Sequence, residues 1–240
     1  MADKSVDIKE LLEAGAHFGH KTSSWHPAMK PFIHSRRGDN YIIDLSETVR
    51  ALETALKFIE ETVANGSQIL LVSTKRQARE IVKATALKLK MPYVTERWLG
   101  GMLTNQNTTA ERIKHLVDLE NKMASGELAN KYNKLEVQRY QEEIDAMNIK
   151  FGGIKEMPKL PGVVFVIDIQ EEINAVREAR KLNIPTVALV DTNTDPRLVT
   201  YPIPSNDDAI KTIQVMCDYV AAAVERGVAK RKPVVAEVKA

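Results

Sequence analysis

The segment from Gly162 to Pro196 limits the possible folds of this chain more than any other stretch. It begins with an apolar run, Val163–Ile167, that is rich in β-branched side chains and too short for a helix, which is typical of a strand buried on both faces. Apolar residues at helical spacing follow over 173–182, and a second buried run covers Thr186–Val190. A strand, a helix and a strand in so few residues predict a βαβ unit with parallel strands and a right-handed crossover.

Further strands and helices should complete this unit, because a parallel sheet needs helices on both faces. The pattern predicts strands at Tyr41–Asp44, Gln68–Ser73 and Pro92–Thr95. With the two strands of the βαβ unit they give a five-stranded parallel sheet of the doubly wound α/β class, Rossmann-like or flavodoxin-like. Tyr201–Pro204 carries two prolines, so we interpret it as an extended connector and not as a central strand.

One predicted helix begins with an unfavourable arrangement of charge. Thr74 is expected to cap this helix, and its first turn then contains Lys75 and Arg76. Cations at a helix N-terminus oppose the helix dipole. An anion held jointly by the helix N–H groups and these two side chains would explain them.

Residues 105–149 interrupt the alternation of strands and helices. Apolar residues recur there at three- and four-residue spacing in two segments joined by a turn at Ser125, which predicts an inserted antiparallel coiled-coil hairpin. Glycine pairs at 100–101 and 152–153 flank it and suggest the joints of a projecting arm; the alternative is a third layer folded back on the sheet. We therefore divide the chain into an irregular N-terminal arm (1–40), an α/β domain (41–104 and 150–226), the hairpin (105–149) and a basic, flexible tail (227–240).

Composition indicates a soluble cytoplasmic protein. The chain has 240 residues, of which 44% are hydrophobic and 28% charged. No apolar run approaches the length of a membrane span, and the first residues do not resemble a secretory signal. The single cysteine, Cys217, lies in an apolar run and excludes an internal disulfide, as expected in a reducing compartment.

Basic residues are clustered although the formal net charge is only +2. Cations alternate with aromatic residues in the N-terminal arm and follow the second and third predicted strands, a pattern that suits phosphate contact and stacking with folded RNA. The alternative is that the aromatic residues pack over the sheet and the lysines are only the solvated faces of helices. The predicted RNA contacts are Lys21, Trp25, Lys30, Arg36, Arg37, Lys75, Arg76, Arg97 and Trp98.

The sequence lacks the motifs of nucleotide-binding enzymes. No glycine-rich phosphate loop follows a strand, and no nucleophile motif occurs. An alternative function remains open, a metal-dependent phosphohydrolase-like enzyme that uses carboxylates at the strand ends: Asp168, Asp191, Asp207 and Asp208. A second hypothesis is a structural Zn²⁺ or Mg²⁺ ion that pins the N-terminal arm to the core, with ligands from His17, His20, Asp191, Asp207 and Asp208.

Four segments carry a resemblance to a known family. They are LLEAGAHFGHKTSSWHPAMKPFI near the N-terminus, RWLGGMLTN before the hairpin, FGGIK after it, and PGVVFVIDIQEEINAVREARKLNIPTVALVDTNTDP. Together they resemble the bacterial small-subunit ribosomal protein two family, in order and from about Val6 to Val224. The resemblance implies an α/β domain with a coiled-coil insertion, no catalytic activity, no required cofactor and no small-molecule substrate. It also implies a cytoplasmic, ribosomal location, contact with 16S rRNA and other small-subunit proteins, and a role in recruiting ribosomal protein one.

Overall fold

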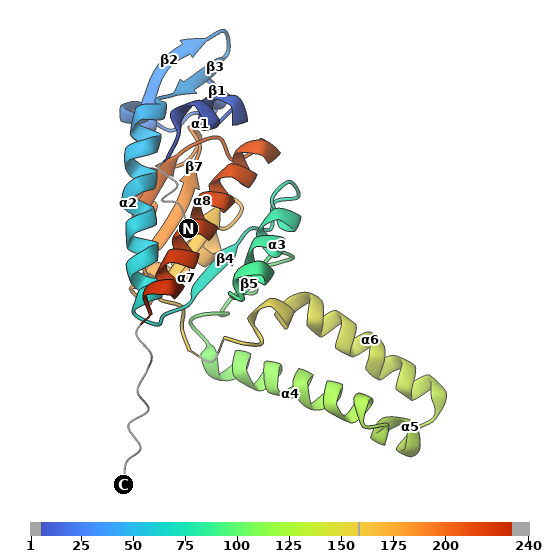
Figure 1. Ribbon diagram of the computed structural model, residues 1–240. Coiled ribbons are helices and arrows are strands. Elements are labelled where there is room, and N and C mark those ends of the chain that lie inside the picture. The colour runs from blue at the N-terminus through green and yellow to red at the C-terminus, as the bar shows by residue number, and fades with distance from the viewer. Residues whose placement is uncertain (1–5, 158, 232–240) are drawn as a thin grey trace.

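The computed structural model describes residues 6–157 and 159–231 and has three parts: a small N-terminal sheet, an α/β body and a projecting helical hairpin (Figure 1). The helices are α1 (Ile8–Ala14), η1 (Pro27–Phe32), α2 (Leu45–Ala64), α3 (Arg79–Leu89), α4 (Gln106–Ala124), α5 (Glu127–Lys131), α6 (Lys134–Phe151), η2 (Gly152–Ile154), α7 (Ile173–Lys181), η3 (Pro196–Leu198) and α8 (Ile210–Lys230), η marking 3₁₀ turns. The strands are β1 (Phe18–Lys21), β2 (Ile33–Arg37), β3 (Asn40–Ile43), β4 (Ile69–Val72), β5 (Tyr93–Val94), β6 (Val163–Ile167), β7 (Thr186–Val190) and β8 (Tyr201–Pro204).

The body is built on a five-stranded parallel sheet in the order β5-β4-β6-β7-β8. Every residue of β4, β6 and β7 is buried, because helices cover both faces. Leu71, Phe165 and Leu189 point to one face and pack against α2, α3 and α8. Their neighbours along the strands point to the other face, against α7 and residues 98–103. The doubly wound α/β class and the β6-α7-β7 unit are thus confirmed.

Two elements differ from the sequence-based prediction. The strand predicted at Tyr41–Asp44 is β3, which pairs antiparallel with β1 and β2 in the N-terminal sheet and not with the parallel sheet. The N-terminal arm is therefore not irregular. The fifth parallel strand is β8, which tolerates Pro202 and Pro204 because it lies at the edge of the sheet and pairs only with β7.

The hairpin extends away from the body, with α4 and α6 antiparallel and α5 at the turn (Figure 1). Leu116 and Leu119 of α4 and Ile144 of α6 form its core, as the three- and four-residue spacing predicts. The glycines at its base have distinct roles. Gly101 adopts a positive φ of +89°, whereas Gly153 packs so closely that a Cβ atom would lie 2.2 Å from the Tyr93 carbonyl oxygen. Gly153 therefore lets the hairpin base dock on β5.

Helix α8 continues to Lys230, into the segment predicted to be a flexible tail. Gly227 permits this, because a Cβ atom there would lie 2.7 Å from the Glu60 carbonyl oxygen of α2. Arg226 pairs with Glu60 at 2.7 Å, Lys230 binds the same carboxylate, and Arg231 donates to the Val63 carbonyl at 2.9 Å. Residues 232–240 of the predicted tail lie outside the described residues. Among the described helices, none is both long and apolar enough to span a membrane.

Candidate RNA-binding surface and acidic cluster

The N-terminal sheet brings the predicted cations of the arm together. Lys21 of β1 and Arg37 of β2 are both paired with Asn40 of the central strand β3. Residues directly opposite each other in a sheet point to the same face, so Lys21 and Arg37 lie in one row on one side. Arg36 is paired with Tyr41 and points to the other side.

Trp25 and Lys30 belong to the segment that connects β1 and β2. Trp25 is half-buried, and its ring centroid lies 5.2 Å from that of Tyr41 at an interplanar angle of 49°. Pro27 begins η1, which His26 caps by accepting a hydrogen bond from the Ala28 amide at 3.2 Å. Lys30 in this turn is exposed. The arm therefore combines exposed cations with a partly accessible aromatic pair.

These cations are largely free of carboxylate partners. Within residues 6–157 and 159–231, no ion pair involves Lys21, Lys30 or Arg37. The Arg36 guanidinium donates to the Gly38 carbonyl at 2.8 Å and lies 3.9 Å from Asp39, with its side chain 61% exposed. We call Lys21, Trp25, Lys30, Arg36 and Arg37 together the arm surface; Arg36 lies on the face of the sheet opposite to Lys21 and Arg37.

Lys75 does not belong to such a surface. Its ammonium nitrogen lies 3.0 Å from Asp168 Oδ2, 2.6 Å from Asp207 Oδ1 and 2.7 Å from Asp208 Oδ1, and its side chain is only 11% exposed. The predicted RNA contact at Lys75 does not fit this geometry, because the charge is neutralised inside the protein. Helix α3 also begins at Arg79 and not after Thr74, whose amide donates instead to the buried carboxylate of Glu172.

The remaining predicted RNA residues follow β4 and β5. Arg76 and Arg97 are exposed, but Trp98 is only 8% exposed and packs into the core. Its indole nitrogen donates to Glu178 Oε1 at 3.0 Å, so the ring is not available for stacking on a base.

Glu178 of α7 organises the segment that leads from β5 into the hairpin. Besides Trp98, it accepts hydrogen bonds from the amides of Gly101 at 2.7 Å, Leu103 at 3.0 Å and Thr104 at 3.1 Å, and from the Thr104 hydroxyl at 3.1 Å. Burial alone would raise the pKa of Glu178, but these donors lower it below its usual value. Nothing in the sequence indicated this role, since a glutamate on an amphipathic helix is usually a solvent-facing charge.

The predicted acidic constellation does come together around Lys75 and His20. His20 Nδ1 lies 3.1 Å from Asp191 Oδ1, and Nε2 lies 3.4 Å from Asp208 Oδ2. The Asp191 carboxylate beside Nδ1 is the main cause that raises the pKa of His20 to about 9. Burial, reinforced by the charges of Asp168 and Asp191, raises the pKa of Asp207 to about 7.

Three of the five predicted metal ligands are arranged to share an ion. Among the described residues, the potential ligand atoms of His20, Asp191 and Asp207 lie within 4.8 Å of one another. Asp191 Oδ2 is buried and has no hydrogen-bond partner within the described part of the chain, so it fits a further cation. Asp208 is bound by Lys75 and His20, while the His17 ring lies against Phe18 with its centroid 4.0 Å away and is not in this group. Imidazole and carboxylate ligands suit Zn²⁺.

Comparison with known proteins gives matches to a single family along almost the whole chain. The family model described as Ribosomal protein S2 matches residues 11–227. The Small ribosomal subunit protein uS2 of Roseiflexus sp. (strain RS-1) is 46% identical over 99% of this chain and 90% of its own length. The proteins of the same name from Nocardia farcinica and Dehalococcoides mccartyi (strain ATCC BAA-2266) are 46% and 47% identical, over 94% and 92% of this chain and 79% and 89% of their own lengths. The chain therefore belongs to the ribosomal protein S2 family, whose members are structural and not catalytic.

Proposed function

We propose that this protein is a structural component of the small ribosomal subunit in the cytoplasm and that it binds 16S rRNA through the arm surface. The observation that carries the proposal is the pair of exposed cations on one face of the β1-β3-β2 sheet, Lys21 and Arg37 on either side of Asn40, which form no ion pair with any other described residue. Arg76 and Arg97 add exposed positive charge beyond the ends of β4 and β5. Phosphate contacts should dominate, because the surface offers charge and few groups that could read base edges.

Charge reversal of the arm tests this proposal. We expect the double substitution Lys21→Glu and Arg37→Glu to weaken binding to a 16S rRNA fragment by roughly tenfold or more and to reduce the salt slope by about 2. Lys57→Glu with Lys181→Glu, two exposed lysines on α2 and α7, is the matched control and should bind like the wild type. Fluorescence anisotropy at several salt concentrations measures both quantities; equal weakening in the two double variants would refute a specific role for the arm.

Exposed apolar residues on and beside α1 support a second contact, with ribosomal protein one. Ile8 and Leu12 are 46% and 53% exposed and lie one turn apart, so they share a face of α1. The ring of Phe18, also 46% exposed, covers the end of this helix beside Gly15. Apolar side chains grouped in this way favour a protein partner over RNA.

We expect Ile8→Asp with Leu12→Asp to reduce the amount of ribosomal protein one on small subunits severalfold, because the substitutions place charge on an apolar interface. Occupancy by the variant itself should stay unchanged, since the arm surface is intact. Quantitative mass spectrometry of purified subunits measures both proteins. An undiminished level of ribosomal protein one on subunits that carry the variant would exclude α1 as its docking site.

The acidic cluster supports a structural ion held by His20, Asp191 and Asp207, which would tie β1 to the carboxyl end of β7 and to residues before α8. Because the pKa of His20 is raised to about 9 and that of Asp207 to about 7, an ion must displace the His20 proton below pH 9 and both protons below pH 7. Apparent Zn²⁺ affinity should therefore rise about tenfold per pH unit between pH 7 and 9 and more steeply below pH 7. Calorimetric titration with Zn²⁺ alone at pH 6.5, 7.5 and 8.5 measures this dependence. Asp191→Asn should abolish binding and Asp39→Asn, at an exposed position, should not; equal binding by both variants would place the ion elsewhere.

A further inference from the structure

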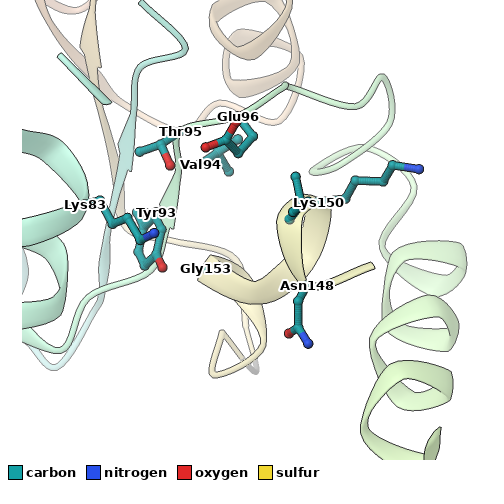
Figure 2. A pocket seen from close by; sticks show the side chains of 9 residues that line it. Lys83, Tyr93, Val94, Thr95, Glu96, Asn148, Lys150 and Gly153 are labelled. Carbon is teal, nitrogen blue, oxygen red and sulfur yellow. The ribbon is translucent and has the colours of Figure 1, made fainter. Parts of the chain in front are cut away.

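Two cavities meet beside Tyr93, where the hairpin joins the body. The first, of about 250 Å³, lies between Lys83 and residues 93–96 of the body on one side and residues 148–150 of α6 on the other (Figure 2). The second, of about 220 Å³, lies between the end of α3 and η2. Both are lined by Tyr93 and Gly153, so they are neighbours on the two sides of the contact between these residues. We call the two cavities together the hairpin-root groove; its residues include Lys83, Leu87, Lys90, Tyr93, Ile149 and Lys150.

Each cavity of the groove has an exposed aliphatic side chain in its wall. Leu87 of α3 is 59% exposed and lines the second cavity, and Ile149 of α6 is 62% exposed and lines the first. The half-buried ring of Tyr93 lies where the two cavities meet, against Gly153. Burial of exposed leucine and isoleucine side chains is favourable, so we expect a partner to cover Leu87 and Ile149.

The rim of the groove is positively charged. Lys83, Lys90 and Lys150 are exposed, and the ion pairs found among the described residues do not include them. In Figure 2 the Lys83 ammonium group lies beside Tyr93, whereas the Lys150 side chain extends away from the cavity. Two other charges in the lining are already paired, Glu96 with Arg79 at 3.2 Å and Lys155 with Glu120 at 2.6 Å. The remaining lysines are complementary to an acidic partner.

The lining favours a protein segment over RNA. A sugar–phosphate backbone would satisfy the lysines but would leave the exposed side chains of Leu87 and Ile149 without apolar contact. A peptide that alternates apolar and acidic side chains can fill both cavities and pair with the rim. It cannot dock by adding a strand to β5, because η2 already covers that edge through the contact between Gly153 and Tyr93.

We propose that the hairpin-root groove binds a segment of another small-subunit protein that carries two apolar anchors flanked by carboxylates. The inference rests on the proposed assembly of this chain into the small subunit. It assigns the base of the hairpin to protein contact and leaves the RNA contact to the arm surface, at the other end of the body (Figure 1).

Site-specific crosslinking tests this assignment on assembled subunits. Cys217 is buried and is the single cysteine, so Leu87→Cys or Ile149→Cys can be labelled selectively with a photoreactive maleimide. The labelled proteins are added to small subunits that lack this protein, sedimented to establish occupancy, and irradiated. We expect both positions to crosslink to one protein segment rich in acidic and apolar residues. Crosslinks to rRNA, or no crosslinks from subunits that are fully occupied, would overturn the proposal, whereas absence of occupancy would instead count against the proposed function.

A paired substitution gives a second readout that does not depend on the label. Leu87→Asp with Ile149→Asp should leave affinity for the 16S rRNA fragment unchanged but lower retention on subunits in a competition wash by about tenfold. Leu135→Asp, at a 60% exposed position farther out on the hairpin, is the control and should be retained like the wild type. Wild-type retention of the paired variant would contradict a docking role for the groove.

Discussion

Replacing Lys75 by methionine should lower the free energy of unfolding by about 3–5 kcal/mol, because it leaves a group of buried carboxylates without its cation. The ammonium group joins Asp168, Asp207 and Asp208 at 2.6–3.0 Å, and the first two of these side chains are 11% and 2% exposed. Methionine preserves most of the side-chain volume, so the loss would reflect charge and not a cavity. Urea denaturation followed by circular dichroism measures it.

Lys88→Met is the matched control for this prediction. Lys88 also forms an ion pair, with Glu225 at 2.9 Å, but its side chain is 66% exposed. Exposed pairs contribute about 0–1 kcal/mol, so this variant should remain close to the wild type. If both methionine variants lost the same small amount of stability, the carboxylate cluster would not depend on Lys75.

The cost of Lys75→Met should also depend on pH. Burial and the neighbouring carboxylates raise the pKa of Asp207 to about 7 even in the presence of Lys75, so protonation of this group stabilises the folded state below that pH and the benefit is lost as the pH rises through it. Removing the ammonium group raises this pKa further. The difference in stability between variant and wild type should therefore be smaller at pH 5 than at pH 8.

Glu178→Gln should loosen the base of the hairpin. The carboxylate accepts hydrogen bonds from three backbone amides, the Trp98 indole and the Thr104 hydroxyl, and an amide group can accept only on its oxygen side. The amides of Leu103 and Thr104 share one oxygen, so an amide NH₂ at that place would leave both without an acceptor. We expect a loss of about 2 kcal/mol in unfolding free energy, moderated because the side chain is partly accessible to water.

Hydrogen exchange provides the local readout for Glu178→Gln. Amide exchange at Gly101, Leu103 and Thr104 should accelerate. Exchange in the central strands β6 and β7 should accelerate only as much as the lower free energy of global unfolding requires. Glu171→Gln, an exposed glutamate just before α7, is the control. Unchanged protection of the three amides would show that the segment before α4 holds its shape without this carboxylate.

The sequence predicted the parts of the fold that depend on local patterns. Continuous apolar runs identified β4, β6 and β7, and helical spacing identified α7 and the hairpin. Local sequence does not indicate which sheet a strand joins. Tyr41–Asp44 looks like any short strand, and it pairs with β1 and β2, which are polar segments with little strand character. The prolines of β8 argued correctly against a central position but could not show that an edge strand remained possible.

For the candidate site, too, the sequence predicted local features and missed contacts between distant residues. The arm cations lie close together in the sequence, and Lys21, Arg36 and Arg37 lie on one small sheet, so their proximity could be predicted, while their contact with RNA stays a prediction. Lys75 was misassigned because its partners lie far away along the chain, Asp168 by 93 residues and Asp207 by 132. Trp98 was misassigned for a similar reason, since its hydrogen-bond partner Glu178 is 80 residues away. When a side chain pairs with residues far away along the chain, the sequence around it does not indicate that pairing.

Occupancy of the small subunit by arm-surface variants tests the central claim most directly. Subunits that lack this protein are mixed with wild type, with Lys21→Glu/Arg37→Glu or with Lys57→Glu/Lys181→Glu, and are sedimented through a sucrose gradient at moderate salt. We predict that the wild type and the Lys57/Lys181 control travel with the subunits, while the arm variant stays near the top of the gradient as a folded protein. Equal occupancy by all three proteins would contradict the assignment of RNA binding to the arm surface.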